Sequence, residues 1–502
     1  MYKQRSWKKF LPFVAGAFLY QQTLYAQVSI TPDPSKKYQV IDNFSASDAW
    51  SGQFVGNWPD AKKNQMADWL FSVDTLADGS PKGIGLSLWR MNFGAGSMEQ
   101  GDASGIKDEW RRAESFLNSD GSIDLGKQSA QQWWITAAKK RGVSQFLGFF
   151  NSPPVAFTRN HRAFAEGGVS NFDSSKSEVF AGYISRLLPA LEKKHGVQFS
   201  YLSPVNEPQW DWSDGGQEGN PYTNAQISSL VHAINNAFRV NKIRTKLLIP
   251  ESGHIKYLLA DDDKPGRGQQ IDDFFGHGAS TRIVPVGDLP AVAPVAAAHS
   301  YFSTSPYEKS VALRSEVASK IASIPGLHYW QSEYCILGDN EGEINGSGKD
   351  TGMRAALYVA KVIHADLVYG NASAWQWWLS ISPYDYKDGL IYIDRNKTDG
   401  QFSDSKILWV LGNYSRFIRP GMQRIGVTVG SADSSLLVSA WQLKKQTVLV
   451  MVNLSASAVD IRLPKGTVSV NTYTTSKSRR FQKQPAGSRL VLAPESVTTV
   501  VY

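Results

Sequence analysis

The chain has 502 residues, of which 42% are hydrophobic and 20% charged, a balance typical of globular proteins with a large core. This composition excludes a disordered chain, and the single cysteine, Cys335, excludes a disulfide scaffold and a cysteine-based zinc site. The formal net charge is +8, which raises the question of a nucleic-acid partner.

Residues 1–26 have the pattern of a secretory signal peptide. A basic start is followed by the short apolar run Phe10–Tyr20 and by Ala26, a small residue suited to cleavage. The run is too short to span a bilayer comfortably, and an uncleaved anchor is the alternative. We therefore expect a secreted or periplasmic protein without a transmembrane helix in the mature chain, and the lone cysteine favours a bacterial source.

The positive charge is concentrated in this leader. It holds four basic residues and no acidic one, so its removal lowers the charge from +8 to +4; they are Lys3, Arg5, Lys8 and Lys9. The rest of the chain carries no long Lys/Arg run, and we expect no nucleic-acid partner. Its 16 Trp, 20 Tyr and 23 Phe favour a carbohydrate partner, because indole rings stack on the apolar faces of sugars. We expect a monomer.

Eight apolar, β-rich runs alternate with helical stretches. The predicted strands are Ile41–Ser47, Ile84–Phe93, Gln145–Asn151, Phe199–Asn206, Lys246–Pro250, Val295–Tyr301, His328–Glu333 and Ala372–Trp378. The predicted helices are Ala61–Ser72, Lys127–Lys140, Ser177–Lys194, Asn224–Arg239, Glu308–Ala322, Thr351–Tyr369 and Asp404–Phe417. This alternation predicts an α/β protein with a (β/α)8 barrel over residues 41–419.

The pattern changes after residue 419. Short alternating strands are predicted at Leu436–Trp441, Thr447–Asn453, Ala458–Leu463, Val468–Thr474 and Ser496–Tyr502. We interpret residues 420–502, together with residues 27–40, as a side β-sandwich. A separate binding module is the alternative, but no Ser/Gly/Pro-rich linker precedes this segment.

Two glutamates end predicted strands on opposite sides of the barrel. Glu207, between Asn206 and Pro208, follows the fourth strand, and Glu333 ends the seventh. Reactive groups of such barrels lie at the carboxyl ends of the strands. Two carboxylates that face each other across the barrel mouth can flank a glycosidic bond, and this pair is the minimum that glycoside hydrolysis needs. The eight histidines form no metal-binding motif, and we expect neither a metal nor another cofactor.

Other carboxylates compete for these roles. Glu251 and Asp211 are rival carboxylates at strand ends. Glu251, after the fifth strand, is the better rival, but that position rarely lies between the acid and the nucleophile. Glu341 and Glu343 lie in a glycine-rich loop where a solvated side chain is expected, and Cys335 is expected to be buried and inert.

At these motifs the chain resembles glycoside hydrolase family 30, from about residue 28 to residue 502. The resemblance implies that Glu207 is the acid/base and Glu333 the nucleophile. It assigns Arg90 to orient the nucleophile and Tyr301, of His299-Ser300-Tyr301, to contact it. The further sugar-binding positions that it implies are Asp48, Trp50, Asn151, Asn206, His299, Trp375 and Trp377, with Trp377 as the sugar platform and Trp378 as a neighbour.

The resemblance implies a retaining double displacement on a β-linked sugar. The segment Ser45–Trp50 is most similar to branches that act on β-1,6-galactan or on fucosides, and we expect β-1,6-galactan. An exo-acting fucosidase, galactosidase or glucosidase, a xylanase, and a non-catalytic carbohydrate-binding or adhesive protein are the alternatives. Residues 149–157 lack the tryptophans of relatives, which leaves the sugar open. The long stretches at 96–126, 155–176 and 208–223 favour cleavage from chain ends.

Overall fold

The structure is a computed structural model that describes residues 1, 27–277, 282–430, 434–464, 467 and 470–502. The predicted signal peptide, Met1 apart, lies outside the described residues. Within those ranges, no helix combines the length and the apolar character that a membrane crossing requires.

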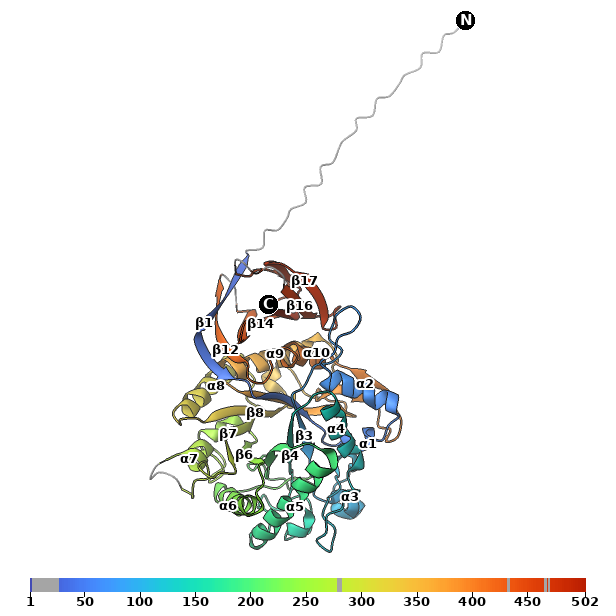
Figure 1. Ribbon diagram of the computed structural model, residues 1–502, viewed down its shortest axis with the longest axis vertical. Coiled ribbons are helices and arrows are strands. Elements are labelled where there is room, and N and C mark those ends of the chain that lie inside the picture. The colour runs from blue at the N-terminus through green and yellow to red at the C-terminus, as the bar shows by residue number, and fades with distance from the viewer. Residues whose placement is uncertain (2–26, 278–281, 431–433, 465–466, 468–469) are drawn as a thin grey trace.

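Eight parallel strands close into a ring, which confirms the predicted barrel (Figure 1). Strand β9 pairs with both β8 and β2 and thereby closes the ring. The strands are β2 (Asn43–Ser47), β3 (Leu88–Asn92), β4 (Gln145–Phe149), β5 (Phe199–Ser203), β6 (Lys246–Ser252), β7 (Val292–His299), β8 (His328–Tyr334) and β9 (Ala374–Ser382). Each overlaps one predicted strand, so the apolar runs located all eight.

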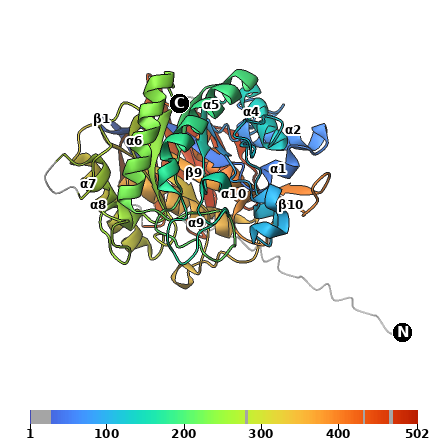
Figure 2. The same cartoon turned by 90° about the horizontal axis from the view of Figure 1, so that it is seen from below.

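Helices surround this ring (Figure 2). The long ones are α2 (Asp60–Phe71), α4 (Ser129–Lys140), α5 (Ser177–His195), α6 (Asn224–Asn241), α8 (Tyr307–Ala322), α9 (Met353–His364) and α10 (Lys406–Ser415). The short ones are α1 (Gly52–Val55), α3 (Ser97–Gln100) and α7 (Gln270–Phe275). Local chemistry sets their ends: Thr223 and Gln226 form a capping box at the start of α6. Gly196 ends α5 with a φ of 61°.

Seven short helical turns complete the connections. They are η1 (Gly101–Ser104), η2 (Glu109–Arg111), η3 (Val155–Phe157), η4 (Ser174–Lys176), η5 (Ile255–Leu258), η6 (Asn340–Gly342) and η7 (Ala365–Tyr369). The predicted helix Thr351–Tyr369 is therefore α9 followed directly by η7, whose backbone turn is wider.

A second sheet of nine strands lies beside the barrel. Its order is β17-β16-β19-β14-β13-β12-β1-β15-β18, and β1 of the N-terminal segment pairs antiparallel with β12. The strands are β1 (Val28–Val40), β12 (Gln423–Gly430), β13 (Leu436–Leu443), β14 (Gln446–Asn453), β15 (Val459–Arg462), β16 (Val470–Thr475), β17 (Gln482–Ala486), β18 (Arg489–Leu492) and β19 (Ser496–Val501). The segments before and after the barrel therefore share one sheet, as predicted.

The two faces of this sheet belong to different cores. In β14, Val448 and Val450 pack into the large core of the barrel, whereas Leu449 and Met451 point into a second, smaller core. Helices α9 and α10 lie between the barrel and this sheet (Figure 1). Residues from both ends of the strand order share the small core, so the sheet curls over itself like a sandwich.

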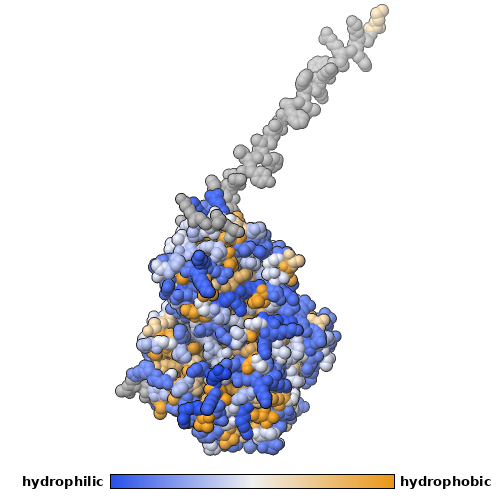
Figure 3. Space-filling model, in the orientation of Figure 1, coloured by the Kyte–Doolittle hydropathy of each residue, from blue (hydrophilic) through white to orange (hydrophobic). Residues whose placement is uncertain are grey.

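Strands with weak sequence signals were not predicted. These strands are β12, β17, β18, β10 (Gly389–Ile393) and β11 (Phe402–Asp404). The last two pair with each other and extend the barrel sheet beyond β9. Strand β17 lies at a sheet edge and carries Pro485 among polar residues, a composition that edge strands tolerate. Figure 3 shows the apolar residues on one face of the molecule in separate spots rather than one broad patch.

A buried ion pair fastens the helices to the barrel strands. Arg314 of α8 donates through Nε to Oδ1 of Asp366 in η7 at 2.6 Å, and both side chains are fully buried. Asp366 also accepts from the Ser300 hydroxyl at 3.1 Å and from Trp375 Nε1 at 3.0 Å. Asp366 thereby fixes the position of Ser300, the residue that follows β7.

Replacing Asp366 with Asn leaves the Arg314 guanidinium buried without its counter-charge. We expect the free energy of unfolding to fall by about 3–5 kcal/mol in chemical denaturation. The control is Asp399→Asn, which breaks a partly exposed ion pair with Lys62 and is expected to cost no more than about 1 kcal/mol. Equal losses in the two variants would contradict this assignment.

Candidate active site

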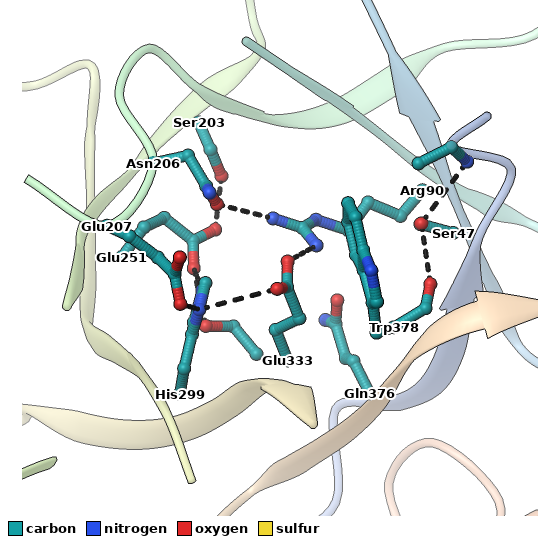
Figure 4. A network of polar contacts seen from close by, with 12 residues as sticks. Ser47, Arg90, Ser203, Asn206, Glu207, Glu251, His299, Glu333, Gln376 and Trp378 are labelled. Carbon is teal, nitrogen blue, oxygen red and sulfur yellow. Dashed lines mark hydrogen bonds and ion pairs between the residues drawn. The ribbon is translucent and has the colours of Figure 1, made fainter. Parts of the chain in front are cut away.

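The carboxyl ends of the barrel strands bring the predicted residues together. Arg90 comes from β3, Asn206 and Glu207 follow β5, His299 ends β7, and Glu333 lies in β8 (Figure 4). A cavity opens at this end of the barrel, and Asn206, Glu207 and Glu333 all line it.

Glu333 is held by two donors. Arg90 forms an ion pair through Nη1 with Oε2 of Glu333, and Tyr301 donates its hydroxyl to Oε1 at 2.9 Å. Arg90 is itself fully buried, with its guanidinium 3.8 Å from the centre of the Phe149 ring and Nη2 donating to Asn206 at 3.1 Å. The side chain of Glu333 is therefore fixed in place, and it lines the cavity.

Phe149, the first of residues 149–157, has a role in this arrangement. Its ring supplies the aromatic face over which the Arg90 guanidinium lies, an arrangement stabilised by cation–π attraction.

Glu207 sits on a strained backbone that its surroundings enforce. Its φ of 44° lies in the left-handed region, which costs a non-glycine residue on the order of 1–3 kcal/mol. Its N–H donates to the carbonyl of Glu251 at 2.8 Å, and Pro208 follows directly. This conformation directs the carboxyl group toward His299, whose Nδ1 lies 2.8 Å from Oε1 of Glu207.

The two carboxyl groups lie close together. One oxygen of Glu207, one of Glu333 and a ring nitrogen of His299 are all within 4.8 Å of one another. Retaining glycosidases hold their carboxyl groups about 5–5.5 Å apart and inverting ones about 6.5–9.5 Å. The spacing here fits the retaining geometry and is shorter than the separation in inverting enzymes.

His299 is in contact with three carboxylates. Besides Glu207, its Nδ1 lies 3.5 Å from Glu333 and its Nε2 lies 3.3 Å from Glu251. Burial by itself would lower the pKa of His299, but the charge of Glu333 and the hydrogen bonds with Glu207 and Glu251 outweigh burial and raise it to about 10. The imidazole is therefore a cation at neutral pH.

The charge of His299 acts differently on the two other glutamates. Burial raises the pKa of Glu207 above its ordinary value despite the hydrogen bond with His299. Burial alone would raise the pKa of Glu251 as well, but His299 and the charge of Arg90 outweigh it and hold the pKa below its ordinary range. Hydroxyls of Ser203 and Ser332 also donate to Glu251, each at 2.5 Å.

The same trio lies close enough together to hold a metal ion. Glu207, His299 and Glu333 are the one group of three potential ligands close enough to share an ion among the described residues. A protonated imidazole has no free lone pair, so His299 cannot serve as a ligand while it balances the carboxylates.

Comparison with known proteins identifies the family. The model of O-glycosyl hydrolase family 30 matches residues 27–392. This chain belongs to that family. The family retains the anomeric configuration of its substrates, so the chain is a retaining glycoside hydrolase.

Individual relatives agree with the family model. The endo-β-1,6-galactanase of Hypocrea rufa is 24% identical over an alignment of 429 positions, and the match covers 82% of this chain and 79% of that protein. The solved structure of a conserved exported protein from Bacteroides fragilis is 32% identical, with a TM-score of 0.88 over 95% of this chain and 100% of that one. The catalytic domain of a family 30 xylanase C from Talaromyces cellulolyticus shares the fold at 20% identity, with a TM-score of 0.68 over 94% of this chain and 99% of that one.

Two predicted tryptophans of this family 30 hydrolase are not in the cavity. Trp375 and Trp377 are fully buried, and their rings lie 6.2 Å apart in the core. Trp378 lines the cavity instead. Trp377, at which the sugar platform was predicted, is therefore buried in the core, and its neighbour Trp378 lies on the cavity wall. Successive side chains of β9 point to opposite faces, and a register shift beside Leu379 sets which of them faces the mouth.

Asp48 and Asn151 lie behind the cavity wall. Asp48 is 1% exposed, and its Oδ1 accepts from the backbone N–H of Asn92 at 2.8 Å, which ties β2 to β3. Burial raises its pKa to about 7. Asn151 is buried as well, and neither residue is among those that line the cavity. Their direct contact with sugar hydroxyls stays a prediction, whereas Trp50 does line the cavity.

The rival carboxylates have other partners. Glu251 is fully buried against His299, and Asp211 is exposed near Lys264 and Arg267. Sequence reasoning missed most of the outer cavity, which is lined by Arg111, Trp210, Trp212, Asp214, Gln217, Phe302, Leu337, Tyr386 and Asp388. Trp210 and Trp212 closely follow the Asn-Glu-Pro motif, and this proximity was the one usable signal.

The three long loops form a joined wall beside the cavity. Ala165 N donates to Trp212 O and Gly219 N to Ala163 O, each at 2.9 Å, which ties 155–176 to 208–223. The buried carboxylate of Glu218 accepts from the Ser97 hydroxyl at 2.5 Å and so reaches 96–126. Glu218 is buried, and burial raises its pKa to about 7.

Replacing His299 with Gln removes the cation beside Glu207. Because a nearby positive charge favours the carboxylate, its loss raises the pKa of Glu207 further. The alkaline limb of the pH–rate profile reports proton loss from the acid, so we expect it to move up by about 1–3 pH units in measurements of kcat/KM.

The matched control is His254→Asn. His254 is a buried histidine outside the carboxylate network, and burial lowers its pKa to about 4, so it carries no charge to lose. An unchanged alkaline limb in His299→Gln would show that His299 does not control Glu207.

Proposed function

We propose that this family 30 hydrolase cleaves β-1,6-linked galactan by double displacement. The observation that carries the mechanism is the close pair Glu207 and Glu333, with Arg90 and Tyr301 on one carboxylate and His299 on the other. The galactanase of Hypocrea rufa supports the substrate. The predicted leader and the likeness to an exported protein of Bacteroides fragilis support secretion.

In the first step an oxygen of Glu333 attacks the anomeric carbon. The glycosidic bond breaks, and Glu207 gives its proton to the departing oxygen. Arg90 and Tyr301 orient the nucleophile, and Trp378 and Trp50 line the cavity in which the sugar stacks. The product is a sugar ester of Glu333 and a released alcohol.

In the second step Glu207 takes a proton from water, which attacks the same carbon and releases Glu333. The net charge of the buried groups is the same before and after the first step. Before the reaction, Arg90 and His299 face the carboxylates of Glu333 and Glu251, with Glu207 protonated. After glycosylation, Glu333 is neutral and Glu207 carries the second negative charge, so the buried site never changes its net charge.

The joined wall supports cleavage from chain ends. Arg111, Trp212, Asp214 and Gln217 extend from it into the cavity. We propose that the wall blocks one direction in which a polymer would continue, so that short products leave from the start of the reaction.

Replacing each catalytic glutamate by Gln separates their roles. We expect Glu333→Gln to lose turnover on every substrate. We expect Glu207→Gln to slow hydrolysis of galactan by about 10²–10⁴-fold. An aryl galactoside whose leaving group needs no proton should still release its aryl group in a burst. The measurement is steady-state and pre-steady-state kinetics, with sugar binding to both variants as the control.

A non-catalytic binding protein would give no turnover for Glu207→Gln to lose. Products that appear first as the α-anomer in NMR spectra would overturn double displacement.

The mode of cleavage is read from early products of β-1,6-galactan. We expect one or two short products that accumulate linearly, with little early fall in the mean length of the polymer. A ladder of intermediate oligosaccharides at early times would show that the wall does not block the continuing polymer. Hydrolysis of β-glucans, xylans or fucosides without action on galactan would show that galactan is not the substrate and that the compound cleaved is.

A further inference from the structure

Asp388 is a buried carboxylate at the mouth of the barrel that the proposed mechanism does not use. It stands immediately before β10, after the loop that leaves β9. It lines the same cavity as Glu333, Trp378 and Cys335, and it is only 5% exposed.

The core holds this residue in place. Trp377 donates its indole N–H to the backbone carbonyl of Asp388 at 2.7 Å. Gly389, the next residue, begins the pairing of β10 with β9. The buried tryptophan therefore positions the loop from which the carboxylate reaches the cavity.

The carboxylate itself lacks a protein partner on one side. Its Oδ1 is buried and has no hydrogen-bond partner among the described residues. A buried oxygen without a donor costs free energy, and such an exception calls for an explanation. Asp388 also belongs to no cluster of potential metal ligands in the described part of the chain. A ligand that brings hydroxyl donors would satisfy it.

The charge of Asp388 suits such a ligand. Burial raises its pKa to about 6, and a hydrogen bond with the Ser382 side chain opposes that rise, as does, more weakly, the positive charge of Arg111. The group is therefore largely ionised at neutral pH, and hydrogen bonds to a charged acceptor are the stronger kind. Arg111 is itself held over the rings of Trp50 and Tyr384, at 4.7 and 5.1 Å.

We propose that Asp388 is a substrate-binding carboxylate, which accepts hydrogen bonds from hydroxyl groups of the sugar ring that packs against Trp378. Aromatic rings select the apolar face of a sugar but do not read its hydroxyls, so a fixed carboxylate beside the ring adds that discrimination. Trp377 acts as a positioning residue through the loop. This inference rests on the proposed glycosidase site and adds a determinant of its sugar specificity.

The test compares wild type and Asp388→Ala on 4-nitrophenyl β-D-galactoside and its 2-, 3-, 4- and 6-deoxy analogues. We expect at least one deoxy analogue to lose about 10–100-fold in kcat/KM with the wild type, the effect of one hydrogen bond to a charged group. In Asp388→Ala the parent sugar should lose a similar factor, and the penalty for that same analogue should vanish.

Controls separate binding from folding. Asp388→Asn keeps the shape of the side chain and should retain the fold while it weakens the same hydroxyl contact. Asp399→Asn, on the exposed loop after β10, should leave the whole series unchanged. If every deoxy penalty is the same with and without Asp388, the carboxylate does not contact the sugar and the inference is overturned.

Failure of the galactan proposal gives a different result. Wild type would then be inactive on all galactosides, and the same comparison would be made with the aryl β-glucoside or β-fucoside that it does cleave. Binding of the corresponding methyl glycosides to the Glu333→Gln variant, measured by calorimetry, decides the contact of Asp388 without turnover.

Discussion

The site depends on one buried cation, His299, in contact with three glutamates. Three carboxylates packed this closely would repel one another strongly, and burial adds to the cost of each charge. The imidazolium and the guanidinium of Arg90 offset this repulsion, while burial raises the pKa of Glu207. In the proposed double displacement, Glu207 gives its proton to the leaving group and takes one back from water.

The rest of the barrel keeps this cluster rigid. Glu251 orients His299 through its side chain and Glu207 through its backbone carbonyl, so one residue of β6 fixes both. Behind β7, the buried Asp366 holds Ser300, between His299 and Tyr301. Contacts of this kind allow the strained backbone of Glu207 to persist, because several of them together fix its conformation.

Buried tryptophans have a supporting role that their number alone does not reveal. Trp375 donates to Asp366, which holds Ser300, and Trp377 donates to the carbonyl of Asp388, which lines the cavity. Trp378, one residue further on, lines the cavity at the barrel mouth. Because successive side chains of β9 point to opposite faces, Trp375 and Trp377 stabilise the core while Trp378 lines the cavity.

The sequence by itself determined the barrel and its two glutamates. Strands and helices each have a local periodicity of apolar residues that can be recognised in the sequence. The carboxyl ends of parallel strands must meet at one mouth of the barrel, so the sequence alone placed Glu207 and Glu333 there. Tertiary structure alone decided three things: that His299 reaches all three carboxylates, that Trp378 rather than Trp377 faces the cavity, and that three distant loops join into a wall. The reason is physical. These features depend on side-chain direction, on a local register shift and on contacts between loops far apart in the chain, none of which leaves a periodic pattern in the sequence.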